Sequence, residues 1–393
     1  MSRARGVIGS RSRPARVEAA AANRPRPPSG TRWPGTVSRT IALGLAGALG
    51  SAGCGGPDAD DGRVYFSEST SHVYEIGPSD THLDQLDERV SFGSIIDVVA
   101  VPGGYFVADG LDPRIVLLDE GLNPVRTMGR EGEGPGEYRL PWHLSRADDR
   151  VLVHDSGNGR VTYLTLEGDF VASRRFPGLA SGIAGHPELG LLVAGDAFPD
   201  HYLTRVSEQA HTAFGPIPAE WIVDPEDSDD SADKVQLPED RVAVTPDGLV
   251  HVLDGDRLAL VSYRPDGELV GIVFLPKEMQ AREVKQNEEM IEALGGRDRV
   301  LSSPVVMSLT PLDDGRLLAG TTSAVTADGL VTRGRVLDLE RLEAIPLVFG
   351  ADVDRPWARA VRVDIDRLDR AVLNPMWTAS LEAAPVRLVD RDR

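Results

Sequence analysis

Short apolar runs that end at an aspartate recur along the chain. Tyr105-Phe-Val-Ala-Asp109 and Val151-Leu-Val-His-Asp155 are each followed, five positions later, by an arginine that opens a second apolar run. The two aspartates are 46 residues apart, and Val250-His-Val-Leu-Asp254 repeats the pattern with a shorter loop. Short apolar runs bounded by turn residues are typical of buried strands. Each unit is therefore predicted to contain several short strands joined by tight turns.

A unit of four strands repeated with a period of 46 residues is typical of a β-propeller. We predict an all-β fold, a six-bladed β-propeller of four-stranded antiparallel blades with one helical insertion. Five blades are expected near 95–128, 142–176, 179–214, 240–275 and 304–349. The sixth is expected to combine 357–389 with the early strands Val64–Phe66 and Val73–Ile76, which would hide the edges of the ring. Five or seven blades stay open, because the pattern is least regular after residue 300.

Two segments interrupt the predicted propeller domain, which spans 63–393. Residues 216–239 include the acid-rich stretch Asp224–Asp233, which lacks the glycine and the terminal glutamate of an EF-hand. A solvated acidic loop is expected there, with adventitious cation binding as the alternative. Residues 277–301 begin with Lys277–Leu294, a stretch without glycine or proline that stops at Gly295. It is predicted to be a helix that packs on the propeller.

The N-terminal region has the pattern of an export signal. Residues 1–40 are rich in arginine and proline, and the uncharged run Ile41–Gly53, 13 residues long, is too short to span a bilayer. Small residues precede Cys54, so residues 1–53 resemble a bacterial lipoprotein signal, although Ser51 stands where an aliphatic residue is expected. The resemblance implies lipidation of Cys54 and a tether over 54–62; a plain signal peptide is the alternative. Because the leader is long, we expect translation to start at codon 37, leaving 1–36 untranslated.

Charge divides the chain at the same place. The whole sequence has a net charge of −19, but residues 1–53 hold nine arginines and one glutamate, which leaves −27 for the rest. Such an acidic domain is a poor partner for nucleic acid, so none is expected. A single cysteine excludes an internal disulfide and zinc sites built on several cysteines. We expect a monomer that is lipid-anchored at the bacterial cell envelope, on the periplasmic face or the cell surface.

A glycine-rich segment, Gly129-Arg-Glu-Gly-Glu-Gly-Pro-Gly-Glu-Tyr138, joins the first two predicted blades. Together with Val153-His-Asp155 in the following blade, it resembles the NHL-type six-bladed propellers. Within them it is most similar to the bacterial envelope lipoprotein branch, which carries a Gly-Pro-Gly-Glu-aromatic linker. The resemblance covers residues 64–393 and is strongest over 95–176. It implies an architecture and no particular activity, because propellers host binding proteins, lyases and hydrolases alike.

A few acidic and histidine side chains are candidates for chemistry. A metal-dependent enzyme of this fold would need oxygen or nitrogen ligands that converge on the central channel. The weak candidates are Asp97, His143, Asp155 and Asp254, with calcium as the ion. The repeated aspartates are better explained as residues that end a strand and accept hydrogen bonds from turn amides. The sequence has no Gly-x-Ser-x-Gly, phosphate-loop or His-Glu-x-x-His motif, so no catalytic residue is predicted.

Successive connections between antiparallel strands must alternate between the two sides of the disc. The short turns are predicted to share one side, the turn face. The longer loops and the linkers between blades are predicted to share the other, the linker face. Long loops on a rigid scaffold usually hold the binding residues. The candidates on the linker face are Asp112, Arg114, Arg130, Glu137, Tyr138 and Arg160, and Tyr138 is also expected to anchor the linker between blades.

The expected function is that of a lipid-anchored, extracytoplasmic propeller that binds a small molecule or an envelope protein without catalysis and without a cofactor. The alternative is a metal-dependent hydrolase or lyase that acts on a small metabolite or a sugar derivative. A third interpretation is an envelope subunit whose propeller only presents a docking surface. A bound calcium-like ion would favour the enzyme, and a partner retained on purification would favour the other two.

Overall fold

The computed structural model describes residues 62–83, 88–176, 180–195, 198, 200–208, 210–222, 241–281, 285, 288, 292, 306–326, 329–349, 361–366, 370–375 and 380–391. The chain divides into two compact units, Met1–Arg39 and Thr40–Arg393, and all described residues belong to the second. The predicted signal, Cys54 and the acid-rich stretch Asp224–Asp233 lie outside the described residues.

Four antiparallel four-stranded sheets follow one another along the described chain. The first sheet holds β4 (Ile95–Val101), β5 (Gly104–Asp109), β6 (Arg114–Asp119) and β7 (Pro124–Met128). The second holds β8 (Pro141–Ala147), β9 (Arg150–Asp155), β10 (Arg160–Thr165) and β11 (Phe170–Arg175). The third holds β12 (Gly182–His186), β13 (Gly190–Ala194), β14 (His201–Val206) and β15 (His211–Pro216), and the fourth β16 (Arg241–Val244), β17 (Val250–Asp254), β18 (Ala259–Tyr263) and β19 (Leu269–Phe274). These bounds agree closely with four of the predicted units.

The C-terminal strands form a larger, 10-stranded sheet with the first strands of the described chain. One part is β20 (Val306–Pro311), β21 (Leu317–Thr326), β22 (Gly329–Asp338) and β23 (Glu343–Phe349). The other part is β24 (Val361–Asp366), β25 (Arg370–Pro375) and β26 (Leu381–Asp390). Strand β2 (His72–Ile76) lies between β23 and β26, while β1 (Ser67–Glu68) pairs with β23 and β3 (Thr81–Leu83) pairs with β26.

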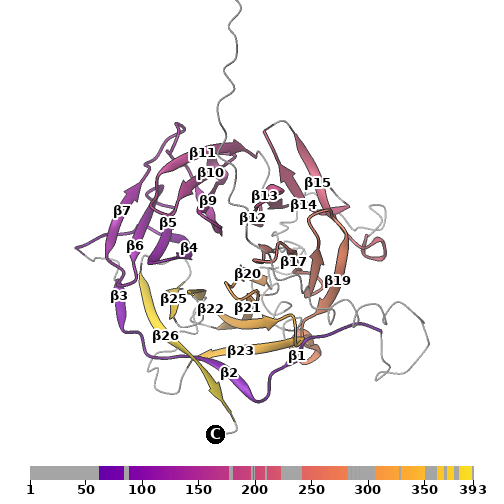
Figure 1. Ribbon diagram of the computed structural model, residues 1–393. Coiled ribbons are helices and arrows are strands. Elements are labelled where there is room, and N and C mark those ends of the chain that lie inside the picture. The colour runs from indigo at the N-terminus through magenta and orange to yellow at the C-terminus, as the bar shows by residue number, and fades with distance from the viewer. Residues whose placement is uncertain are drawn as a thin grey trace, which may run out of the picture. The chain divides into compact units, whose positions relative to one another are not determined.

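The first strands of these groups form a closed circle. Each of β4, β8, β12, β16 and β20 contacts the next one, β20 contacts β24, and β24 contacts β4. Figure 1 shows the sheets arranged around this centre, which is the architecture of a β-propeller. Because side chains alternate along a strand, each sheet contributes to two cores. In β9, Val151 and Val153 pack with the first sheet, whereas Leu152 packs with Ile183 and Leu191 of the third.

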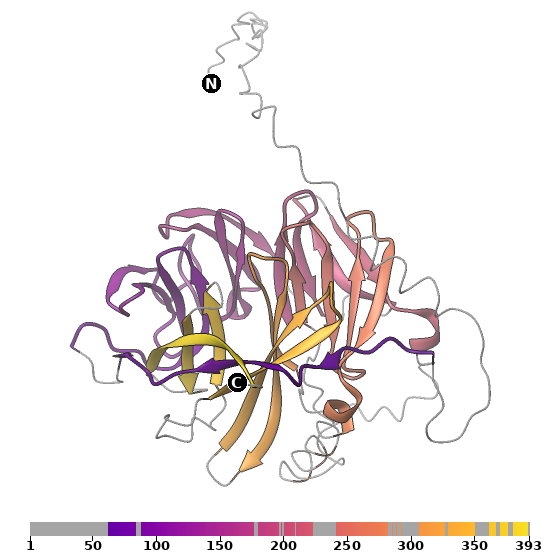
Figure 2. The same cartoon turned by 60° about the horizontal axis from the view of Figure 1, so that its bottom comes forward.

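Residues 64–83 cross the outer edges of the last sheets, and we call this segment the belt (Figure 2). The amide of Phe66 donates to the carbonyl of Phe274 in β19, and β1 and β2 then run parallel to β23. Strands β2 and β3 pair with β26, so the two ends of the described chain do meet in the last sheet, as predicted. The prediction that Val64–Phe66 belong to the last blade was wrong, because these residues pair with the outer edge of β19 in the fourth sheet.

The second predicted insertion begins as a helix. Residues 277–281 are helical, as are 285, 288 and 292, and the amide of Gln280 donates to the carbonyl of Pro276. Met279 is fully buried in one cluster with Phe66 and Leu275, so this end of the helix packs on the fourth sheet and the belt. Two short 3₁₀ helices are Ser156–Asn158 and Ala219–Trp221. None of the described helical segments has both the length and the apolar character that a bilayer crossing requires.

Candidate functional site

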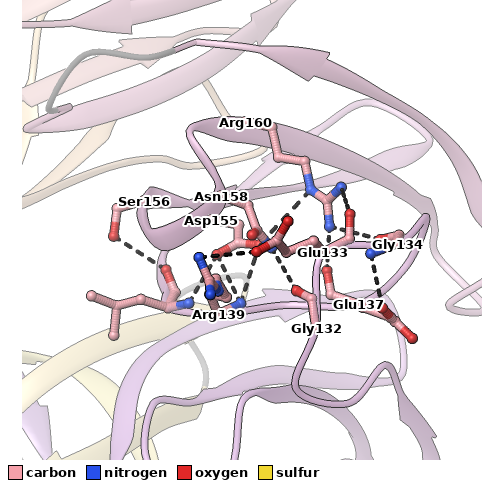
Figure 3. Close-up of polar contacts among 10 residues, drawn as sticks. Gly132, Glu133, Gly134, Glu137, Arg139, Asp155, Ser156, Asn158 and Arg160 are labelled. Carbon is pink, nitrogen blue, oxygen red and sulfur yellow. Dashed lines mark hydrogen bonds and ion pairs between the residues drawn. The ribbon is translucent and has the colours of Figure 1, made fainter.

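A buried carboxylate organises the junction between the glycine-rich linker and the second sheet. Asp155 ends β9 and is fully buried. Its oxygens accept hydrogen bonds from the backbone amides of Arg139 (3.1 Å) and Leu140 (2.9 Å) and from the side-chain amide of Asn158 (2.6 Å), as Figure 3 shows. Asn158 also donates to the carbonyl of Gly132 (2.8 Å). The carboxylate therefore fixes the end of the linker onto the loop between β9 and β10.

Arg160 completes this junction from the first position of β10. Its guanidinium donates to the carbonyl oxygens of Glu133 (2.9 Å), Gly134 (2.8 Å) and Glu137 (2.5 Å). Its Nε lies 3.8 Å from the carboxylate of Asp155. We call this pair, an aspartate at the end of the second strand and an arginine near the start of the third, an Asp–Arg clamp. The clamp satisfies backbone groups of a linker that contains no regular secondary structure.

The linker also holds itself together. The carboxylate of Glu137 accepts from the amide of Gly134 (2.8 Å) and from Arg130 (2.8 Å), and these bonds hold the pKa of Glu137 below its ordinary value. Gly132 has a φ of +156°, and a Cβ there would overlap the Glu137 carboxylate. Gly129 has a φ of +81°, and a Cβ there would meet the ring of Tyr138. Both glycines are thus required by close packing within the linker.

The first sheet repeats the clamp. Asp109 ends β5, and its oxygens accept from the amides of Gly93 (2.9 Å) and Ser94 (3.0 Å), which precede β4. Arg114 donates to the carbonyl of Ser91 (2.5 Å) and lies 3.5 Å from Asp109. As in the second sheet, the two side chains tie the linker to the loop between the second and third strands.

A variant of the clamp occurs in the fourth sheet. Asp254 accepts from the backbone amide of Arg257 (2.8 Å) and from the hydroxyl of Tyr202 (2.7 Å) in the third sheet. The guanidinium of Arg257 donates to Asp254 (3.1 Å) and to the carbonyl of Trp221 (2.7 Å) in the preceding linker. The three repeated aspartates therefore accept loop and linker hydrogen bonds, in agreement with their interpretation as strand-end residues.

Tyr138 lies inside the molecule. Its ring is fully buried among Met128, Val153 and Leu164, between the first and second sheets. Burial raises the pKa of its phenol, and its hydroxyl has no hydrogen-bond partner among the described residues. The side chain thus anchors the linker, as expected, and does not lie on the surface of the linker face.

The candidate binding residues differ in how much of them is exposed. Arg114 and Arg160 are largely covered by the linkers they hold. The side chain of Arg130 is 81% exposed and that of Asp112 is 61% exposed, so these two lie on the surface. Sequence analysis missed the exposed ion pair between Arg139 and Glu133 (3.1 Å) and the exposed side chain of Leu111. Their positions in a linker and a loop were the signal that could have identified them.

Two of the weak metal candidates lie together. The carboxylate of Asp97 in β4 lies 3.9 Å from Nδ1 of His143 in β8 and accepts from the amide of Leu144 (2.7 Å). Nε2 of His143 lies 3.1 Å from the carbonyl oxygen of Ala180. Asp155 ends β9 in the second sheet, where it binds the linker, and Asp254 ends β17 in the fourth sheet, so neither joins this pair. Within the described residues, no three His, Cys, Asp or Glu side chains are arranged to hold a metal ion.

A second histidine, His154, lies behind His143. It is 1% exposed, its ring stacks on that of His143 with centroids 6.1 Å apart, and Phe176 meets it edge-on. Neither ring nitrogen has a hydrogen-bond partner among the described residues, and burial lowers the pKa of His154 to about 4. The alternation of β9 predicted a side chain between sheets but not this lack of partners.

Comparison with known proteins identifies the fold. No family model matches the sequence. A Bacteroides fragilis protein named as a candidate exported protein shares 12% identity with a TM-score of 0.51, covering 83% of this chain and 99% of its own. A Bacteroides thetaiotaomicron protein of unknown function (14% identity, TM-score 0.48, 80% and 76% coverage) and virginiamycin B lyase of Staphylococcus aureus (9% identity, TM-score 0.44, 79% and 99% coverage) are also similar. The Bacteroides fragilis structure is β-propeller-like, in agreement with the β-propeller fold that the described strands of this chain form.

Proposed function

We propose that this chain is a six-bladed, lipid-anchored propeller of the bacterial cell envelope that binds a small molecule or an envelope protein on its linker face, as a monomer and without catalysis. The lipid anchor rests on the signal pattern that ends at Cys54. The count of six rests on the circle of first strands, from β4 to β24, and on the completion of the last blade by β2 and β3.

One observation carries the binding role. The Asp–Arg clamps of the first and second sheets hold the linkers ahead of β4 and β8 by hydrogen bonds to their backbone amides and carbonyls. Asp112, Arg130, Glu133 and Arg139 project from these fixed loops with exposed charged groups. A surface whose loops are already ordered loses little conformational entropy on binding, which favours affinity. The linker face thus has the rigidity and the chemical variety of a binding surface.

A metal-dependent hydrolase or lyase is the second candidate, favoured by the neighbouring side chains of Asp97 and His143. Both belong to strands of the inner circle, β4 and β8, and both side chains are buried. A carboxylate and an imidazole are ligands that a catalytic metal ion accepts. In this alternative calcium or another divalent ion would be retained in the purified protein.

Two charge-reversal variants test the proposal. The linker-face variant changes Asp112→Lys, Arg130→Glu, Glu133→Lys and Arg139→Glu; the turn-face variant changes Glu120→Lys, Asp149→Lys, Glu167→Lys and Asp266→Lys. A metabolite library screened by thermal shift should contain a compound that raises the Tm of the original protein and of the turn-face variant, but not of the linker-face variant. Loss of the shift in the turn-face variant alone would contradict the assignment of the face.

The anchor and the absence of catalysis need separate measurements. Mass spectrometry of the membrane fraction should find a lipidated peptide that begins at Cys54, and Cys54→Ala should release the protein from the membrane. Metal analysis of the purified protein tests the alternative. A stoichiometric divalent ion that is lost from an Asp97→Ala variant would favour the enzyme.

A further inference from the structure

Aromatic and cationic side chains gather where the described chain begins, at the outer edge of the fourth sheet. We call this group the tether-side patch; its members are Arg63, Tyr65, Trp221, Ile222, Phe274 and Lys277. Three segments far apart in sequence supply them: the start of the belt, the 3₁₀ helix that ends at Trp221, and β19 with the helix that follows it.

Phe274 is the centre of the tether-side patch. Its ring lies 5.5 Å from that of Tyr65 and 6.0 Å from that of Trp221, which meets it edge-on. The guanidinium of Arg63 lies 4.8 Å above the Phe274 ring, and the ammonium of Lys277 lies 4.6 Å above the Tyr65 ring. Arg63 and Lys277 are exposed, and Ile222 is 47% exposed beside Trp221. Phe274 itself is buried, and Tyr65 and Trp221 are half-buried around it. The surface of the patch is therefore formed by Arg63, Ile222 and Lys277 with the exposed parts of Tyr65 and Trp221.

The predicted tether brings this patch close to a membrane. Gly62 is eight residues after Cys54, and a fully extended chain spans about 3.3–3.6 Å per residue. A lipidated Cys54 would thus hold Arg63 within about 30 Å of the bilayer surface. Trp and Tyr favour the boundary between hydrocarbon and water, and Lys and Arg reach from it toward phosphate groups. The composition of the patch matches this boundary.

The charge of the patch indicates which lipids it fits. Exposed Glu220 and Glu278 lie next in sequence to Trp221 and Lys277. Anionic lipids would be repelled by these carboxylates. A zwitterionic headgroup, which presents a phosphate to the cations and an ammonium to the acids, suits a surface of mixed charge.

We infer that the tether-side patch rests on the zwitterionic headgroup layer of the membrane that holds the chain's own anchor. This inference rests on the proposed lipidation of Cys54. Contact at this edge would orient the propeller with the fourth sheet toward the lipid and the first sheet away from it. The linker face would then stand across the membrane plane, accessible from the side.

A single introduced thiol can test this contact, because Cys54 is the one cysteine of the chain and its sulfur would carry the lipid. Ile222→Cys places a thiol in the patch, and Val125→Cys in β7, where the side chain is 61% exposed, is the matched control. Both proteins are labelled with an environment-sensitive fluorophore and reconstituted by their anchors into phosphatidylcholine vesicles. The probe at 222 should shift to the blue and be quenched by a lipid-phase quencher. The probe at 125 should do neither.

Two further variants distinguish binding of the patch to lipid headgroups from simple closeness of the anchored protein to the membrane. A Gly/Ser insertion after Gly56 lengthens the tether, and the quenching at 222 should persist if the patch itself binds the headgroups. Arg63→Glu combined with Lys277→Glu should reduce it severalfold without lowering the Tm by more than a few degrees. Equal quenching at 222 and 125, or loss of quenching with the longer tether, would overturn the inference. Mass spectrometry of the vesicle fraction reports lipidation independently. A lipidated chain without quenching at 222 would overturn the inference alone, whereas an unlipidated chain would overturn the proposed anchor and the inference with it.

Discussion

Two outer strands that the belt covers, β19 and β23, differ in composition from two that it leaves open, β7 and β11. Strand β19 reads Leu-Val-Gly-Ile-Val-Phe and has no charged residue, and β23 has one glutamate at its start. The open outer strands β7 and β11 read Pro-Val-Arg-Thr-Met and Phe-Val-Ala-Ser-Arg-Arg, with three arginines and no acid between them. Among the described residues, no strand pairs with the outer edge of β7, β11 or β15.

This difference follows from the physics of sheet edges. An exposed edge presents unpaired amide and carbonyl groups to any other chain, and natural proteins cover such edges or protect them with charges, prolines and bulges. The belt covers β19, β23 and β26. Arg126 of β7 is held by Asp169 (2.8 Å), and Arg174 of β11 pairs with Glu208 (3.4 Å). The contrast of β19 and β23 with β7 and β11 therefore follows the belt. It does not extend to β26, which is covered and holds Glu382, Arg387 and Asp390, or to β15, which is open and has no charged residue.

Removal of the belt should have the largest effect. Deletion of residues 64–76 exposes the apolar edges of β19 and β23 and removes the buried side chains of Phe66, Tyr74 and Ile76. Each buried side chain of this size contributes about 1.5–3 kcal/mol, and a domain has about 5–15 kcal/mol in total. We expect an insoluble protein, or a Tm lowered by tens of degrees in circular dichroism. The single change Phe66→Ala, expected to cost about 3–5 kcal/mol, keeps the test informative if the deletion cannot be purified.

Breaking an Asp–Arg clamp should lower the free energy of unfolding by less than removal of the belt does. The loss should also differ between the second and the fourth sheet. Asp155→Ala leaves the amides of Arg139 and Leu140 and the side-chain amide of Asn158 without their acceptor, and it removes the carboxylate beside Arg160. The loss should cost about 3–5 kcal/mol in denaturant unfolding. Asp254→Ala should cost about 1–3 kcal/mol. In that sheet Arg257 keeps its place 5.0 Å above the Trp221 ring.

Asp112→Ala is the control, because this exposed side chain should change the stability by no more than about 0.5 kcal/mol. Equal losses for Asp155→Ala and Asp254→Ala would show that the clamp contributes the same stability with and without the belt.

Acid should destabilise the second and the fourth sheet through one buried histidine in each. Burial lowers the pKa of His154, in the second sheet, and of His251, in the fourth sheet, to about 4, against an ordinary value of 6.5. The folded state then binds fewer protons than the unfolded state, so stability is lost as the pH falls from about 6.5 toward 4. Each histidine should contribute a loss of about 3 kcal/mol.

The two rings differ in their partners above this pH range. His251 lies within hydrogen-bond distance of Thr245 (3.0 Å) and Ser262 (2.8 Å), whereas His154 has no partner among the described residues. His154→Leu should therefore keep its stability at pH 7 and lose part of its acid sensitivity. His251→Leu should be destabilised by about 1–3 kcal/mol at pH 7. Unfolding curves collected between pH 4 and 8 would measure both, and an unchanged acid profile in His154→Leu would contradict the first expectation.

The sequence predicted the repeated parts of the fold because their signals are local. The first sheet begins and ends at Ile95 and Met128, as predicted, since each strand is bounded by turn residues and its apolar run is continuous. The belt was partly misplaced because strand pairing between distant segments leaves no local pattern: Val64–Phe66 could have joined any open edge. The sequence also shows the spacing of aspartate and arginine. It does not show that the guanidinium of Arg160 donates its hydrogen bonds to backbone carbonyls of the linker.

The smallest effect on stability should come from the arginines of the open edges. Arg126→Val together with Arg174→Val and Arg175→Val removes two exposed ion pairs, each worth about 1 kcal/mol or less. The Tm should therefore change little.

The triple variant is instead expected to self-associate, because β7 and β11 would become apolar edges like β19 but without a belt. Size-exclusion chromatography and light scattering should show oligomers that grow with concentration. The control is the single variant Arg264→Val, a change outside the outer strands, which should stay monomeric. If the triple variant also stays monomeric, the arginines are not what protects these edges, and the register shifts between β6 and β7 and between β10 and β11 would be the remaining protection.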